Sequence, residues 1–159
     1  MNKEKIKTIA IAIIIPLLVG GISSFLTMDG MDKFKYLDQP FLSPPSWVFP
    51  VVWTILYILM GIASYLIYKD KNVITYEEKE KALLLYVVQL IFNFFWSIIF
   101  FNMQMFVFAF IWLIILWGMV LLLIIYAYKV NKKASYLLIP YILWLTFAGY
   151  LNIMIALLN

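Results

Sequence analysis

The sequence has no cysteine, no histidine and no arginine, and it carries little charge. Its 159 residues include 12 lysines and 8 acidic residues, which together give 13% charge and a net charge of +4. Without cysteine and histidine, disulfides, thiolate chemistry and the usual zinc, copper and haem-iron ligands are excluded, so no metal site is expected. The positive surplus is small and scattered, and we therefore expect no nucleic-acid partner.

What the sequence has in excess is apolar surface. Hydrophobic residues make up 66% of the chain, far above the roughly 45–50% of soluble domains. A spanning helix needs about 20 mostly apolar residues, and the uncharged segments, the longest divided at "NMQM" (102–105), provide five. The sequence predicts an all-α integral membrane protein, a bundle of five transmembrane helices forming one domain over residues 1–159. The helices are expected near residues 6–27, 46–68, 80–101, 105–128 and 135–157, with a long outer loop over 28–45.

The lysines predict how the chain lies in the membrane. Ten of the 12 fall before the first helix, in 69–81 or in 129–133, which five spans place on one side. Because cytoplasmic loops are enriched in lysine, we expect a cytoplasmic N-terminus and an outer C-terminus. The first helix also resembles a secretory signal, but the segment 20–24 is a poor cleavage site and the apolar run continues past it. A retained helix is therefore expected.

The spans contain no acidic or basic residue at depth. A proton relay, an ion-coupling site and a general acid–base pair are therefore excluded. Conventional hydrolysis and group transfer are excluded for the same reason, and any chemistry must come from a bound ligand.

The second predicted helix opens with "PFLSPPSWVFPVVW" (40–53). Ser43 is expected to cap the helix, with Pro44 at its first position, and Pro50 is expected to kink it by removing a bond to Ser46. Polar and aromatic residues then recur at helical spacing, which predicts a pocket wall or, alternatively, an interfacial aromatic belt. They are Ser46, Phe49, Trp53, Tyr57, Met60 and Ser64.

Two other helices carry polar or notched faces. Tyr86, Gln89, Asn93, Trp96, Ser97 and Phe100 share one face of the third helix. Its two amides either join helices or offer hydrogen bonds to a ligand, and spacing does not decide between these readings. In the fifth helix, the small Ala148 lies one turn from Trp144 and leaves a notch for a flat ligand or for another helix.

The remaining helices show simpler patterns. Pro16, Gly20 and Ser24 recur every four residues in the first helix, which favours close helix packing. The fourth helix offers only Trp112, Trp117 and Gly118, and it is predicted to be the most lipid-exposed.

Three stretches together resemble the translocator protein family, also called tryptophan-rich sensory proteins or peripheral-type benzodiazepine receptors. They are "PPSWVFPVVWTILYILMGIASYL" (44–66), "YVVQLIFNFFWSIIFF" (86–101) and "YLLIPYILWLTFAGYLN" (136–152). The resemblance implies a five-helix bundle, usually dimeric, in a bacterial cell membrane, with a pocket open toward the loop between the first two helices. It also implies binding of tetrapyrroles such as protoporphyrin and haem, and of isoquinoline carboxamides and benzodiazepines. No intrinsic cofactor is expected.

Carried over position by position, the resemblance implies a ligand pocket drawn from three helices. Its members are Phe49, Trp53, Tyr57, Gln89, Asn93, Trp144, Phe147 and Ala148. The chain departs from the family pattern at Lys33-Phe34 and Leu42, where family members often have aromatic residues, although Lys33 and Lys35 offer partners for porphyrin carboxylates. The tail also lacks the sterol-recognition ending of animal members, so no dedicated cholesterol site is expected.

Three functions are compatible with these patterns. The first is tetrapyrrole binding with light- and oxygen-dependent breakdown, in which Trp53 and Trp144 exchange electrons with the pigment. The second is transport of porphyrins and similar hydrophobic molecules. The third is stress sensing through a partner protein, although the short lysine-rich loops offer little output surface.

Overall fold

The structure, a computed structural model, describes residues 3–159; residues 1 and 2 of the predicted domain lie outside the described range. Five long helices are apolar enough to cross a membrane, which confirms the predicted bundle. They are α1 (Lys3–Leu26), α3 (Val48–Tyr68), α4 (Tyr76–Ser97) with its π-helical extension η2 (Ile98–Asn102), α5 (Phe106–Val130) and α6 (Lys132–Leu158). The short elements are α2 (Met28–Phe34) and the 3₁₀ turn η1 (Val73–Thr75).

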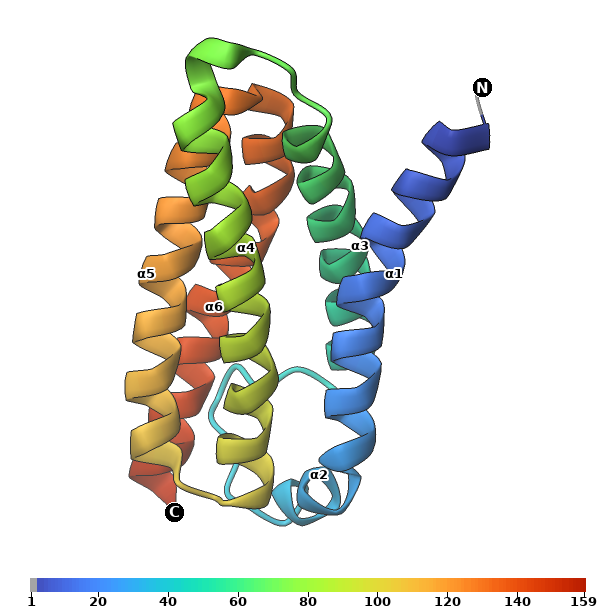
Figure 1. Cartoon of the computed structure of the whole chain (residues 1–159). Coiled ribbons are helices and arrows are strands. Elements are labelled where there is room, and N and C mark those ends of the chain that lie inside the picture. The colour runs from blue at the N-terminus through green and yellow to red at the C-terminus, as the bar shows by residue number, and fades with distance from the viewer. Residues whose placement is uncertain (1–2) are drawn as a thin grey trace.

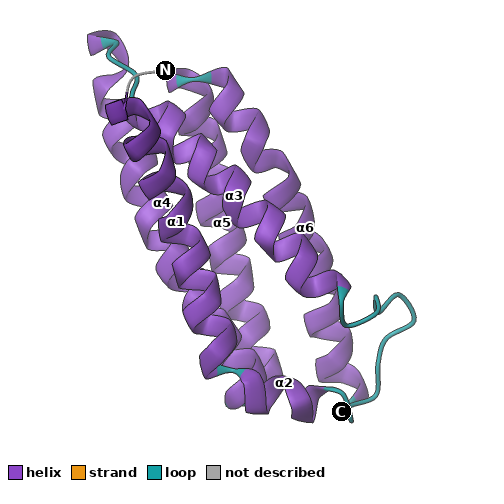
Figure 2. Cartoon of the chain, turned by 90° about the vertical axis from the view of Figure 1, so that its right-hand side faces the viewer, coloured by secondary structure: helices purple, strands orange, loops and turns teal. Residues whose placement is uncertain are grey.

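The long helices lie side by side, as Figures 1 and 2 show. Around the bundle the order is α1, α3, α6, α5 and α4, and α1 packs mainly on α3. One end carries α2, the α4–α5 turn and the C-terminus, and we call it the α2 end. The other carries the start of α1, the α3–α4 connection and the α5–α6 turn, and we call it the lysine-rich end.

The helix boundaries differ from prediction where local capping decides them. The Asn131 side chain accepts hydrogen bonds from the backbone N–H groups of Lys133 and Ala134, so α6 begins at Lys132 rather than at 135. Glu77 and Glu78 lie in the first turn of α4, which therefore begins at Tyr76 rather than at 80. The predicted loop over 28–45 is partly helical, because Met28–Phe34 forms α2.

The predicted start of the second helix was wrong. Helix α3 begins at Val48, after Trp47, and Ser43 donates its hydroxyl to the Gln39 side chain instead of capping the helix. Pro50 is consequently the third helical residue. Backbone N–H groups in the first turn have no partner within a helix, so Pro50 removes no bond and does not cause the predicted kink.

The fourth predicted helix is not the most lipid-exposed. In an apolar stretch of 18 residues, 28% of the residues are buried within the bundle in α5, against only 11% in α1. Trp112 is half-buried: its indole N–H donates to the Phe92 carbonyl oxygen over 2.9 Å, and its ring stacks on Phe92 at 4.4 Å. Trp112 thus joins α5 to α4.

Candidate functional site

A cavity of about 360 Å³ lies at the α2 end, enclosed by α1, α2, α3, α4 with η2, and α6. This volume is within the range of about 300–1,000 Å³ for small-molecule sites. Most of its exposed lining is apolar. The lining residues are Leu17, Gly20, Gly21, Ser23, Ser24, Thr27, Met31, Phe34, Lys35, Ser46, Phe49, Pro50, Trp53, Thr54, Tyr57, Trp96, Ser97, Phe100, Phe101, Trp144, Ala148, Leu151 and Asn152.

Aromatic rings from α3 and α6 form one wall of the cavity. Trp53 stacks on Tyr57, one turn deeper in α3, with ring centroids 5.5 Å apart. Phe49 meets Trp144 of α6 edge-on at 6.0 Å. The buried indole N–H of Trp144 has no hydrogen-bond acceptor among the described residues. An unpaired buried donor is costly, but protein atoms cover this N–H, so a ligand reaches it only if neighbouring side chains move.

The end of α4 supplies a second aromatic wall. Trp96 stacks on Phe100 at 5.1 Å, and its indole N–H donates to the Asn152 side chain of α6 over 3.2 Å. The chain then passes into the π-helical turn η2, which brings Phe100 and Phe101 into the same lining.

The wall from α1 is made of small residues. A Cβ atom added to Gly20 would lie 2.1 Å from the Tyr57 ring, so only glycine fits there. The neighbouring Gly21 and Ser24 also line the cavity. The stripe through Gly20 and Ser24, expected only to allow close packing, thus also shapes the site. Sequence spacing showed the small side chains but not that a cavity lies in front of them.

Short helix α2 closes the end of the cavity. Phe34 contacts Phe100 and Phe101 at 5.6 and 5.5 Å between ring centroids. Gly30 lies so close to the backbone of η2 that an added Cβ would be 2.5 Å from the Phe101 carbonyl oxygen. The departure from the family pattern at Phe34 therefore does not remove this segment from the site, because Phe34 itself lines the cavity.

Lys35 is the one lysine among the lining residues. Its ammonium group lies 2.7 Å from the Asp32 carboxylate, and this hydrogen bond raises the pKa of Lys35. The group is exposed and remains charged at neutral pH. Lys33, the other candidate partner for a ligand carboxylate, does not line the cavity.

The two amides of α4 lie behind the aromatic wall instead of in it. Tyr57 donates its hydroxyl to Asn93 over 2.8 Å, and Asn93 donates to Tyr141 of α6 over 2.9 Å. Tyr141 in turn donates to Gln89 over 2.8 Å, and Gln89 donates to the sulfur of Met60 over 3.7 Å. We call these side chains the Tyr57–Gln89 network. It joins α3, α4 and α6. Of the two alternatives left open by the sequence, the two amides therefore join helices in this structure.

The network also bears on the cavity. The rings of Tyr57 and Tyr141 both contact Trp53, the first by stacking at 5.5 Å and the second edge-on at 6.2 Å. Asn93, which bonds to both hydroxyls, therefore holds the two rings that support this indole.

The structure brings most of the predicted site residues together. Phe49, Trp53, Tyr57, Trp144 and Ala148 line one cavity. Gln89 and Asn93 are 0% and 2% exposed and lie outside its lining. Phe147 also lies outside the lining and packs against Trp144 at 5.5 Å.

A second hollow of similar volume lies on the surface between α5 and α6. It is more open, almost wholly apolar, and lined by none of the predicted site residues. The indole N–H of Trp117 and the hydroxyl of Thr146, which face each other there, are joined by a hydrogen bond of 2.9 Å. The hollow is bounded by two helices only, whereas five helices contribute to the lining of the α2-end cavity, which is therefore the better candidate.

Comparison with known proteins agrees with this architecture. The model of the TspO/MBR family matches residues 12–158, nearly the whole chain. The chain belongs to this family. It is 37% identical over 149 residues to a tryptophan-rich protein TspO of Archaeoglobus fulgidus, covering 93% of this chain and 94% of the relative. It is also 37% identical over 163 residues to the protein of that name in Chlorobaculum tepidum, covering 100% and 99%.

Family membership extends to animals. The translocator protein of Homo sapiens is 35% identical to this chain over 130 residues, which cover 82% of this chain and 76% of the human protein. The family named from the sequence motifs is thereby confirmed, and so is a multi-pass membrane protein.

Proposed function

We propose that the α2-end cavity binds flat hydrophobic ring systems, with tetrapyrroles such as protoporphyrin as the main ligand class. The observation that carries this proposal is the convergence of Trp53, Trp96 and Trp144 from three helices on one cavity. Broad aromatic faces stack well on a conjugated macrocycle, and the small residues of α1 leave room for a planar ligand. Isoquinoline carboxamides and benzodiazepines meet the same requirements.

The polar groups of the cavity support an orientation for this ligand. The charged Lys35 at the α2 end, now paired with Asp32, would exchange this partner for a propionate carboxylate of the macrocycle. The indole N–H of Trp144 would donate to an acceptor on the ligand once the side chains that cover it move. The macrocycle would then lie among the aromatic rings, with its carboxylates toward the α2 end.

We further propose that the bound porphyrin is broken down in light and oxygen. A porphyrin absorbs visible light, and its excited state accepts an electron from a nearby indole of Trp53 or Trp144 and passes it to molecular oxygen. The indole radical cation left behind takes an electron from the ground-state macrocycle, which restores the tryptophan. The macrocycle radical cation then combines with the superoxide formed from oxygen, and the macrocycle is oxidised. The chain contributes the electron donors and the enclosure, because its spans contain no carboxylate, ammonium or imidazole group at depth to act as an acid or base.

Binding is tested by titrating protoporphyrin into the purified full chain and following the absorption of the pigment. Trp53→Ala and Trp144→Ala should each weaken binding by about 1–3 kcal/mol through lost stacking. Trp117→Ala is the matched control, because Trp117 lies on α5 outside the cavity. An equal loss at Trp117 and Trp144 would mean that the pigment partitions into the detergent and protein surface instead of occupying a site.

Breakdown is tested by illuminating the bound pigment in air and under argon. We expect its visible absorption to disappear faster in air than in empty micelles, and more slowly in the Trp53→Phe, Trp144→Phe double variant. If binding is retained but the pigment is lost no faster than in micelles, the breakdown proposal fails and the cavity carries or shields its ligand. That outcome would favour transport of porphyrins over their breakdown as the function.

A further inference from the structure

The two ends of the bundle differ strongly in charge. Ten lysines and five carboxylates lie at the lysine-rich end, which gives a side-chain charge of +5. The α2 end has two lysines and three carboxylates, which give −1. The charge of the chain is therefore concentrated at the end opposite the cavity.

Lysines at this end lie over tyrosine rings. Each ammonium nitrogen is within 6 Å of a ring centroid, the range of a cation–π interaction. The pairs are Lys69 on Tyr65 at 5.2 Å, Lys79 on Tyr68 at 5.6 Å, Lys81 and Lys129 on Tyr126 at 5.7 and 5.6 Å, and Lys132 on Tyr128 at 5.3 Å. They involve the ends of all four helices from α3 to α6 and so form a collar around the bundle.

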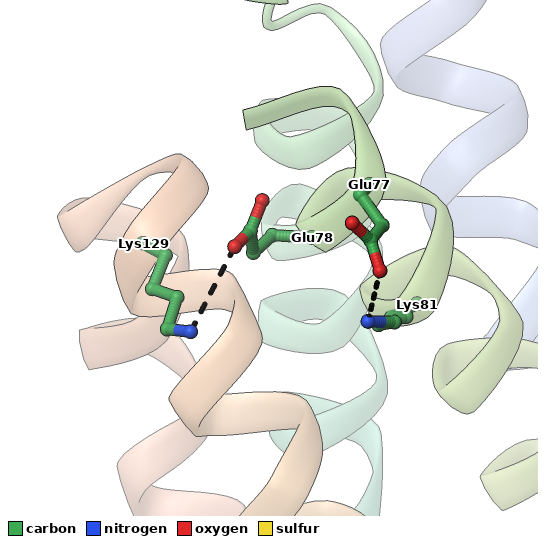
Figure 3. A network of polar contacts seen from close by, with 4 residues as sticks. All are labelled: Glu77, Glu78, Lys81 and Lys129. Atoms are coloured by element: carbon green, nitrogen blue, oxygen red, sulfur yellow. Dashed lines mark hydrogen bonds and ion pairs between the residues drawn. The ribbon is translucent and has the colours of Figure 1, made fainter. Parts of the chain in front are cut away.

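Only some of the lysines in this collar form ion pairs with carboxylates. Figure 3 shows Lys81 paired with Glu77 on α4, and Lys129 of α5 reaching Glu78 at 3.8 Å. Lys79 donates to the neutral backbone carbonyl of Asp70. Over residues 3–159, no ion pair involves Lys69 or Lys132. These two ammonium groups, together with that of Lys79, therefore keep an uncompensated charge.

The tyrosines fix the depth of these charges. Tyr68, Tyr128 and Tyr136 are 60%, 45% and 60% exposed at the ends of membrane-spanning helices. Half-exposed tyrosines in such places lie at the level of the lipid headgroups. Lys79 and Lys132, held over Tyr68 and Tyr128, are therefore kept at headgroup depth and do not extend into water. Lys69 lies over Tyr65, which is only 8% exposed.

We propose that this collar, with Lys69, Lys79 and Lys132 as its open positions, binds the headgroups of anionic phospholipids. A phosphodiester that carries a net negative charge supplies the counter-charge that the protein lacks there, at the depth where the tyrosines hold the ammonium groups. An acidic protein segment would meet the same charge from the water side only. The proposal does not depend on what occupies the cavity.

The test uses the purified full chain in micelles that contain equal amounts of phosphatidylglycerol and phosphatidylcholine. The ratio of the two lipids retained after detergent exchange should favour phosphatidylglycerol, and the preference should fall as salt is added. Neutralising one lysine near a charged membrane surface changes binding by about 1 kcal/mol, or about fivefold. Lys132→Gln and Lys69→Gln should therefore each lower the ratio up to about fivefold.

Two further variants separate this site from general charge attraction. Lys33→Gln removes the same charge from the α2 end and should leave the ratio unchanged. Tyr128→Leu keeps every charge but removes the ring beneath Lys132, and it should lower the ratio. An equal loss in Lys33→Gln, an unchanged ratio in Tyr128→Leu, or no preference in the unmodified chain would each overturn the proposal. So would capture of a poly-glutamate peptide without any lipid preference.

Discussion

Tyr57 and Asn93 join the wall of the cavity to the centre of the bundle. The ring of Tyr57 lines the cavity, while its hydroxyl donates to the Asn93 side-chain oxygen over 2.8 Å. Asn93 is 2% exposed and continues the bonding to α6 through Tyr141. A substitution in the buried network should therefore change the position of the ligand-facing rings. A ligand that displaces Tyr57 should in turn change the hydrogen bonds of the network.

Removing the hydroxyl of Tyr141 should destabilise the bundle. Tyr141→Phe leaves both Gln89 and Asn93 without one partner each, which we expect to cost about 1–3 kcal/mol of unfolding free energy. Equilibrium unfolding in a denaturing detergent measures this loss. Tyr136→Phe is the control on the same helix, because Tyr136 is 60% exposed. Equal effects of the two substitutions would show that the network adds no stability.

Gly20→Ala should disturb the cavity through Tyr57. The new methyl group would lie 2.1 Å from the Tyr57 ring, so either the ring or α1 must move. Overpacking of this kind costs about 1–3 kcal/mol, and we expect weaker protoporphyrin binding together with a lower unfolding temperature. Gly21→Ala is the matched control, because its added Cβ would meet no atom within 4 Å. If Gly21→Ala weakens binding as much, the close contact with Tyr57 is not the cause.

Enlarging Ala148 should fill the notch beside Trp144. Ala148→Leu places three more carbon atoms in the cavity lining, and we expect protoporphyrin binding to weaken by about 1–3 kcal/mol, the cost of overpacking. Leu143→Phe also enlarges a side chain of α6, but at a position that is 63% exposed, and it should leave binding unchanged. Titration of both variants decides whether the α6 wall contacts the ligand.

Lys35→Gln should weaken binding of protoporphyrin but not of its dimethyl ester, which has no carboxylate to pair. Because Asp32 raises the pKa of Lys35, the ammonium cation persists to a higher pH than its ordinary value of 10.5. The difference between the two ligands should therefore be constant from pH 6 to pH 9 and disappear only above that pKa. A difference that changes within the neutral range would point to a group other than Lys35.

The orientation predicted from the lysines remains to be measured. A reporter that is active only in the cytoplasm, fused after Asn159, should be inactive, whereas the same reporter fused before Met1 should be active. Activity of the C-terminal fusion would reverse the orientation and place the cavity on the cytoplasmic side. The homodimer implied by the family resemblance likewise stays a prediction.

The sequence predicted the large-scale fold because apolar length and lysine position are read directly from the chain. It also identified the buried face of α4, since Gln89 and Asn93 repeat at helical spacing. Their partners were not readable: Tyr57 and Tyr141 are 36 and 48 residues from Asn93 along the chain, and tertiary packing alone brings the three together. A periodic pattern shows which way a side chain points, but not what it meets.

The mistakes of prediction arose at helix ends and at aromatic residues. Ser43 met the requirements of a cap, but three proline residues near it delay the helix to Val48, where Trp47 precedes it. The fourth helix was predicted to be the most lipid-exposed because it offers few notable residues, yet the indole N–H of Trp112 needs an acceptor within the membrane, and the Phe92 carbonyl oxygen provides one. Both outcomes depend on local geometry that composition does not determine.

The position of the Tyr57–Gln89 network has a consequence for the movement of molecules across the membrane. Below Tyr57 the bundle is filled by side chains that are almost fully buried, namely Met60, Gln89, Asn93 and Tyr141. A transported molecule that enters from the α2 end therefore meets closely packed side chains, and these residues leave no open passage to the lysine-rich end. To cross, it would have to break the hydrogen bonds between three helices or leave sideways and follow the outer surface of the bundle. In this conformation buried side chains separate the α2-end cavity from the lysine-rich end.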